Sequence, residues 1–113
     1  MDAALALQQA DDDGELLRAL VSTFLQDYPK VLAALRAALD ARNLPAAQER
    51  AHSLKGSVGI FAAAGVCDAA QALEQSPAPA NWPELEQHWE HLNRELDRLR
   101  PELSFLLTDT KAA

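Results

Sequence analysis

The chain has 113 residues, of which 49% are hydrophobic and 24% charged, and it carries a net charge of −7. This composition is typical of a globular domain rather than a disordered chain, and the negative charge argues against binding to nucleic acid or to an anionic membrane surface. The single cysteine, Cys67, excludes an intrachain disulfide. No apolar run is long enough to span a bilayer and no signal segment opens the chain, so we expect one cytoplasmic domain over residues 1–113.

The N-terminal residues predict a short helix over residues 2–9, in contact with the rest of the chain through Leu5. The run Asp-Asp-Asp-Gly at residues 11–14 ends this helix, and Asp12 with Glu15 fits a capping box for the next one. The acidic run also invites a calcium-loop interpretation. It lacks the alternating ligands and the terminal Glu of an EF-hand, which favours a helix start.

Residues 13–42 carry one apolar stripe at helical spacing, and this stripe keeps its phase on both sides of Pro29. We therefore expect a single kinked helix rather than two helices. A turn at Asn43 and Leu44 follows, and Pro45 suits the first position of a new helix. The stripe consists of Leu17, Leu20, Val21, Phe24, Tyr28, Val31, Leu35, Ala38 and Leu39.

Three further helices are expected over residues 45–63, 64–75 and, after a proline-containing loop at residues 76–80, from the Asn81 cap to the frayed residues 108–113. The last helix contains Pro101, which we expect to kink it without changing its phase. The fold predicted from these patterns is all-α, an antiparallel up-down four-helix bundle with a short additional N-terminal helix. The buried positions are Ala47, Ala51, Leu54, Val58 and Phe61 in the first of these helices, Val66, Ala69, Ala70 and Leu73 in the second, and Trp82, Leu85, Trp89, Leu92, Leu96, Leu99, Leu103 and Leu106 in the third.

His52 projects about 140° away from the centre of the buried stripe of its helix, so it faces solvent or an incoming molecule. A neutral imidazole is a competent nucleophile, and the ammonium of Lys55 one turn later is suited to neutralise a phosphoryl group. Gly56 and Gly59 each cost about 1 kcal/mol of helix propensity, and beside His52 they clear an approach to the ring. The alternative is a merely solvated histidine, with glycines that let another helix pack closely.

Residues 51–74 resemble the signature of histidine-containing phosphotransfer (HPt) domains. The resemblance rests on the run His-Ser-Leu-Lys-Gly-Ser-Val-Gly that begins at His52, on Ala63, and on the pair Leu73-Glu74. Two positions depart from the pattern. Ala62 replaces a frequent glycine, and Ile60 stands where a polar residue is common, which affects the expected docking surface.

The resemblance implies a phosphocarrier of a multistep phosphorelay. His52 would accept the phosphoryl group on Nε2 from the aspartate of one receiver domain and pass it to another receiver, with Lys55 supplying charge. The receiver would bring its own Mg²⁺, and this chain would need no cofactor. The expected docking residues are Gln48, Glu49, Gly56, Gly59 and Ile60.

Two other interpretations remain open, a structural or scaffolding bundle without phosphate and a metal-binding bundle. His88 and His91 share a face of the last helix with Glu84 and Glu95, but a solvated face is the simpler interpretation. Cys67 and both tryptophans are expected to serve packing.

The sequence holds neither a phosphate-binding P-loop nor a dinucleotide-binding glycine motif, so we expect no kinase activity and a need for a separate phosphoryl donor.

Overall fold

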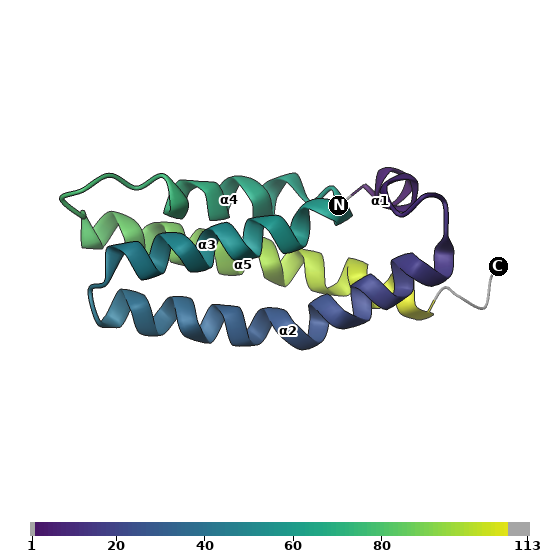
Figure 1. Ribbon diagram of the computed structural model, residues 1–113, viewed down its shortest axis with the longest axis horizontal. Helices are drawn as coiled ribbons and strands as arrows, with labels where there is room; N and C mark the ends of the chain where they lie inside the picture. Colours follow the sequence, from purple (N-terminus) through teal and green to yellow (C-terminus); the bar gives the residue numbers. More distant parts are fainter. Residues whose placement is uncertain (1, 109–113) are drawn as a thin grey trace.

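The structure, a computed structural model, describes residues 2–108, and of Ala3 and Thr108 the backbone only. Within these residues it contains helices and no strand, so the predicted all-α fold is confirmed (Figure 1). The elements are α1 (Ala3–Gln9), α2 (Gly14–Asp40), α3 (Leu44–Val58), the short 3-10 helix η1 (Gly59–Phe61), α4 (Ala64–Glu74) and α5 (Trp82–Thr108). Fraying was expected over residues 108–113. Apart from Thr108, the last residue of α5, these residues lie outside the described part.

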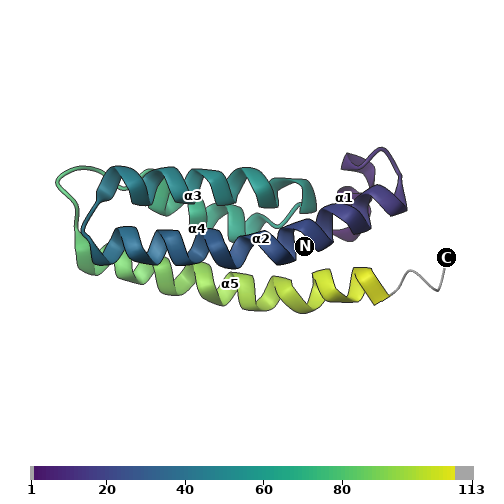
Figure 2. The same ribbon diagram turned by 60° about the horizontal axis from the view of Figure 1, so that its bottom comes forward.

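Helices α2 to α5 run side by side and alternate in direction (Figures 1 and 2). The two 27-residue helices, α2 and α5, form the long pair of a bundle that measures 50 × 20 × 18 Å. Helix α3 packs against α2 and α4, and α5 packs against α2 and α4. At one end of the bundle α1 packs against η1 and α2. No helix within residues 2–108 is long and apolar enough to cross a membrane.

The apolar stripes form one continuous core. All five stripe residues predicted for the α3 region are buried, as are Leu85, Leu92, Leu96, Leu99 and Leu103 of α5. Helix α2 passes through Pro29 and α5 through Pro101 without interruption, so the single-helix predictions are confirmed.

The two tryptophans were expected in the core, and this expectation is wrong in degree. Trp82 and Trp89 are only half-buried. The guanidinium groups of Arg42 and Arg36 lie 5.3 Å from the centroids of Trp82 and Trp89, respectively, so each ring has one face on the core and another on a cation.

Two details at the N-terminal end also differ from the prediction. The cap of α2 is Asp13, whose side chain accepts from Leu16 N at 3.1 Å, while Asp12 adopts a left-handed conformation with φ 58°. The capping box was therefore assigned one residue too early. Leu5 is 41% exposed, and α1 contacts the core through Ala6, which is fully buried, and through the partly buried Leu7.

The end of α3 is the largest departure from the predicted boundaries. The expected helix runs to residue 63, whereas α3 ends at Val58, and Gly59 opens a tighter 3-10 turn. Ala62 then takes the left-handed conformation (φ 52°, ψ 39°) and turns the chain into α4. Such a conformation costs an L-residue about 1–2 kcal/mol, which gives a physical reason for the glycine that is frequent at this position in the HPt pattern.

Helix α4 is held at both ends by its neighbours. At its start no side chain caps it, and the carboxylate of Glu95 from α5 occupies the space beside Gly65, where a Cβ would overlap it. At its end Gln48 of α3 donates from Nε2 to the backbone oxygen of Ser76 at 2.8 Å. These two contacts fix the position of α4 along the bundle.

Candidate functional site

The candidate site lies where α3 faces the C-terminal end of α4. His52 is on the outer side of α3, and its side chain is 70% exposed, as its helical phase predicts. Its Nδ1 atom lies 3.0 Å from Oε1 and 3.1 Å from Oε2 of Glu74, the last residue of α4. The ring is thus held by a neighbouring helix while most of its surface is open to solvent.

Lys55 shares the same carboxylate. Its Nζ lies 3.0 Å from Oε1 and 2.9 Å from Oε2 of Glu74, and its side chain is 29% exposed. From the sequence, this ammonium is expected one turn after His52, suited to neutralise a phosphoryl group. In the structure Glu74 lies between the two side chains, so that one carboxylate binds both an imidazole and an ammonium.

Glu74 is anionic in this arrangement. The hydrogen bond from Lys55, followed by that from His52, holds the pKa of the Glu74 carboxyl below its usual value. An ionised carboxylate only accepts hydrogen bonds, so the proton of the His52–Glu74 contact belongs to Nδ1. In the neutral ring this assignment leaves the lone pair on Nε2.

The two glycines beside His52 are not required by the packing of the bundle itself. A Cβ added at Gly56 or at Gly59 would meet no atom within 4 Å. Gly56 is exposed within α3, while Gly59 is half-buried and caps the C-terminal end of the helix. The alternative that these glycines admit another helix of the same chain therefore finds no support.

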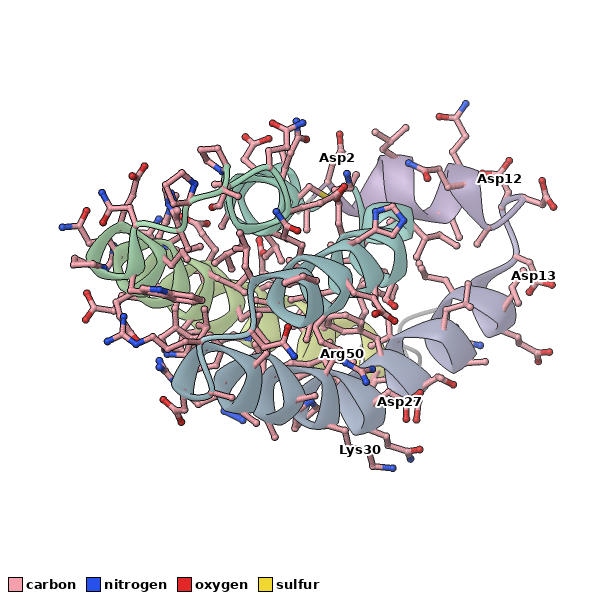
Figure 3. All side chains as sticks on the ribbon, turned by 60° about the vertical axis from the view of Figure 1, so that its left-hand side comes forward. Asp2, Asp12, Asp13, Asp27, Lys30 and Arg50 are labelled. Carbon is pink, nitrogen blue, oxygen red and sulfur yellow. The ribbon has the colours of Figure 1, made fainter. Side chains whose placement is uncertain are left out.

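The other residues expected to dock a partner fall into different environments. Glu49 is exposed on α3, whereas Gln48 is half-buried and its amide is engaged with Ser76. Ile60 is half-buried in η1 and lines an apolar groove of about 210 Å³ between α2 and α3. Charged side chains lie on the same side of the bundle as this groove: Arg50 of α3, and Asp27 and Lys30 of α2, which Figure 3 labels. The remaining walls of the groove are Leu20, Thr23, Phe24, Asp27, Tyr28, Val31, Leu54, Ser57 and Phe61.

The side chains considered for a metal do not converge. His88 lies 3.5 Å from Glu84, and His91 lies 3.5 Å from Glu95, each pair within α5. Among residues 2–108 no three His, Cys, Asp or Glu side chains come together in a way that would hold a metal ion. Cys67 is half-buried, and burial raises the pKa of its thiol.

The residue that sequence reasoning did not place in the site is Glu74. It belongs to the Leu-Glu pair on which the HPt resemblance rests, but it stands 22 residues after His52. Only the antiparallel packing of α3 and α4 brings the two together. The sequence showed only an acidic residue at the end of the helix that follows the histidine, and its spacing did not indicate that this residue contacts His52.

The bundle presents an exposed, oriented imidazole beside an ammonium. In the comparison with protein families, the family model of the Hpt domain matches residues 19–102. The chain belongs to the Hpt domain family, whose members are phosphohistidine carriers in phosphorelays rather than kinases and interact with receiver domains. Neither the comparison with curated proteins nor that with solved structures gave a significant match.

Proposed function

We propose that His52 is the phosphoacceptor of this domain, that it takes the phosphoryl group from the aspartate of one receiver domain and that it passes the group to the aspartate of another. The observation that carries this assignment is the contact of Nδ1 with Glu74, on a ring that is 70% exposed. The ring is oriented by one nitrogen and keeps the other available, which an incidental surface histidine does not require.

The chemistry of the first step follows from this geometry. The lone pair on Nε2 of His52 forms a bond to phosphorus, the bond between phosphorus and the aspartyl oxygen of the receiver breaks, and the aspartate leaves with the electron pair. Lys55 adds positive charge within one helical turn of the reacting nitrogen. The Mg²⁺ that assists phosphoryl transfer belongs, in this proposal, to the receiver.

The docking surface in this proposal is the outer side of α3 with η1. Glu49 and Gly56 are exposed there, and Gly59 and Ile60 continue the surface toward the end of α3. The open space above Gly56 and Gly59 lets the backbone of a receiver come close to the imidazole. Gln48 contributes by fixing the end of α4 next to this surface.

The test is transfer from a receiver domain that has been phosphorylated with acetyl phosphate. We expect the mass of this chain to increase by one phosphate, in a form that is labile to acid and stable to base, as a phosphohistidine is. Peptide mapping locates the phosphate, and the His52→Gln variant is the control. A chain that accepts no phosphate from receivers or from phosphoramidate, a small donor with a P–N bond, would instead be a scaffolding bundle.

A further inference from the structure

One flank of the bundle, between the end of α2 and the start of α5, combines aromatic rings with charges of both signs. Trp82 and Trp89, the two tryptophans of the chain, both lie on this flank, and both are half-buried. The guanidinium groups of Arg42 and Arg36 lie 5.3 Å from the centroids of these two rings. Trp and Arg are enriched at protein interfaces and often dominate the binding energy there. The flank therefore has the composition of an interface.

The charges on this flank are balanced, although the chain as a whole is acidic. A groove of about 280 Å³ is lined by two cations, Arg36 and Arg42, and by two carboxylates, Asp40 and Glu86, beside Trp82. The chain carries a net charge of −7, so two copies repel each other in general. At this groove the charges of opposite sign cancel, and a second acidic molecule meets no net repulsion.

The polar groups of the groove have capacity left for a partner. Arg36 binds Asp40 and Glu86, each at 2.8 Å, yet the side chains of these two carboxylates remain 66% and 47% exposed. Arg42 lies against Trp82 and forms no ion pair with another of residues 2–108. A guanidinium has five N–H donors, so Arg42 can still bind a carboxylate.

We propose that this flank is the interface of a homodimer, in which Arg42 of each copy pairs with Asp40 of the other. A two-fold axis places the same patch on both sides of an interface, so a patch that holds both signs of charge can be complementary to itself. A partner whose surface carries a single sign would meet like charges here, whichever sign it had. The balance of charge thus favours a second copy of this chain over a strongly acidic or strongly basic partner.

The proposed interface leaves the exposed histidine accessible. His52 lies on the outer side of α3 and contacts α4. Figure 2 shows α3 along one edge of the bundle and α5 along the opposite edge, with α2 between them in front. A second copy on the flank of α2 and α5 therefore does not cover His52, and the dimer presents two imidazoles at its outer sides.

The first experiment follows the mass of the full chain by sedimentation velocity between about 1 µM and about 1 mM. We expect the mass to rise from 12.3 kDa to twice this value as the concentration rises. Tryptophan fluorescence reports on the same step, because both tryptophans lie in the proposed interface. Their emission should shift to shorter wavelength, and quenching by acrylamide should weaken, in parallel with the rise in mass.

The second experiment reverses charges across the proposed contact. Arg42→Glu places a carboxylate opposite Asp40 of the second copy, and Asp40→Lys places an ammonium opposite its Arg42. Each variant alone should dimerise at least about tenfold more weakly than the unmodified chain. An equal mixture of the two should dimerise again, because opposite charges then meet at both contacts. The matched control is Arg50→Glu, which makes the same change at an exposed position of α3 and should dimerise normally.

Rescue in the mixture separates an interface from a merely structural role of Arg42 beside Trp82, which mixing would not restore. Thermal melts establish that each variant is folded before its mass is compared. A chain that stays monomeric up to about 1 mM would overturn the inference and leave this flank to solvent or to a different protein. Dimerisation of Arg42→Glu equal to that of the unmodified chain, or a mixture that stays monomeric, would overturn it as well. None of these outcomes bears on His52 as the phosphoacceptor.

Discussion

The three histidines of this chain all lie beside a glutamate, yet only one of these pairs has the features of a site. His88 and His91 meet Glu84 and Glu95 of their own helix, one turn away and at 3.5 Å. His52 meets Glu74 from a different helix at 3.0 Å, and Lys55 binds the same carboxylate. His52 is also the most exposed of the three, with 70% of its side chain accessible against 27% for His88 and 48% for His91.

The difference shows that a histidine next to an acidic residue is a weak sign of function. A pair at helical spacing arises from sequence alone and is common on solvated helices. A pair that bridges two helices depends on the whole fold, and here it orients a ring whose surroundings two glycines keep open. The distinction can be tested on the residues that create it.

The largest effect is expected for His52→Gln, which removes the nucleophile. Phosphate acceptance should disappear, while the free energy of unfolding should change by less than about 0.5 kcal/mol because the side chain is exposed. The measurement is mass spectrometry after incubation with a phosphorylated receiver, alongside a thermal melt. His88→Gln and His91→Gln are the matched controls and should accept phosphate normally. Phosphate on His88 or His91 in the His52→Gln variant would erase the distinction among the three histidines.

The next largest effect is expected for Gly56→Gln, which fills the open space beside His52. Transfer should slow by about tenfold or more because a receiver can no longer approach closely. Stability should hold, or rise by about 0.4–1 kcal/mol, because a Cβ added at this exposed helical position meets no atom within 4 Å. A transfer assay and a melt on the same preparation decide the outcome. Unchanged transfer would show that no partner docks over Gly56, and an unfolded variant would contradict the open space seen there.

A smaller effect is expected for Lys55→Ala. An ammonium near the surface contributes on the order of 1 kcal/mol to a nearby charge, so transfer should slow by about fivefold rather than stop. Lys30→Ala, which removes an exposed ammonium of α2 (Figure 3), is the control and should transfer at the normal rate. Stopped-flow measurement with one receiver compares the three proteins. A rate for Lys55→Ala equal to that of the unmodified chain would remove Lys55 from the transfer mechanism.

The smallest effect on transfer, and a gain in stability, is expected for Ala62→Gly. The left-handed backbone at this position is strained for alanine, and relief of the strain exceeds the entropy that glycine adds to the unfolded chain. We expect a net gain of about 0.5–1 kcal/mol with no change in transfer. Ala33→Gly, at an exposed position inside α2, is the control and should lose about 1 kcal/mol. Chemical denaturation of both variants is the measurement, and a destabilised Ala62→Gly would show that Ala62 is not strained.

The number and order of the helices follow from the sequence because their apolar stripes are regular. The stripe through Ala47, Ala51, Leu54 and Val58 predicts both the buried face of α3 and the exposure of His52. The same regularity explains the misplaced end of α3. Phe61 is buried in phase with this stripe, so periodicity alone does not reveal that the backbone tightens at Gly59.

The part of the site that the sequence does not predict is the connection between helices. Lys55 and Gly56 lie within one turn of His52, so local spacing is sufficient to find them. Glu74 lies on the next helix, and its contact with His52 depends on how far α4 extends along α3. That distance is set by the strained turn at Ala62 and by the contacts of Gly65 and Gln48, none of which has a periodic signature.

The anchoring of α4 at both ends also bears on how long a partner stays bound. Glu95 beside Gly65 and Gln48 at Ser76 hold the helix that carries Glu74, so the imidazole is oriented before any receiver arrives. An encounter then needs little ordering of this chain, and the complex does not depend on a large interface to offset that cost. In the proposed function the carrier leaves one receiver before it meets the next, and it would gain from this arrangement because an interface that needs little ordering can stay small and dissociate rapidly.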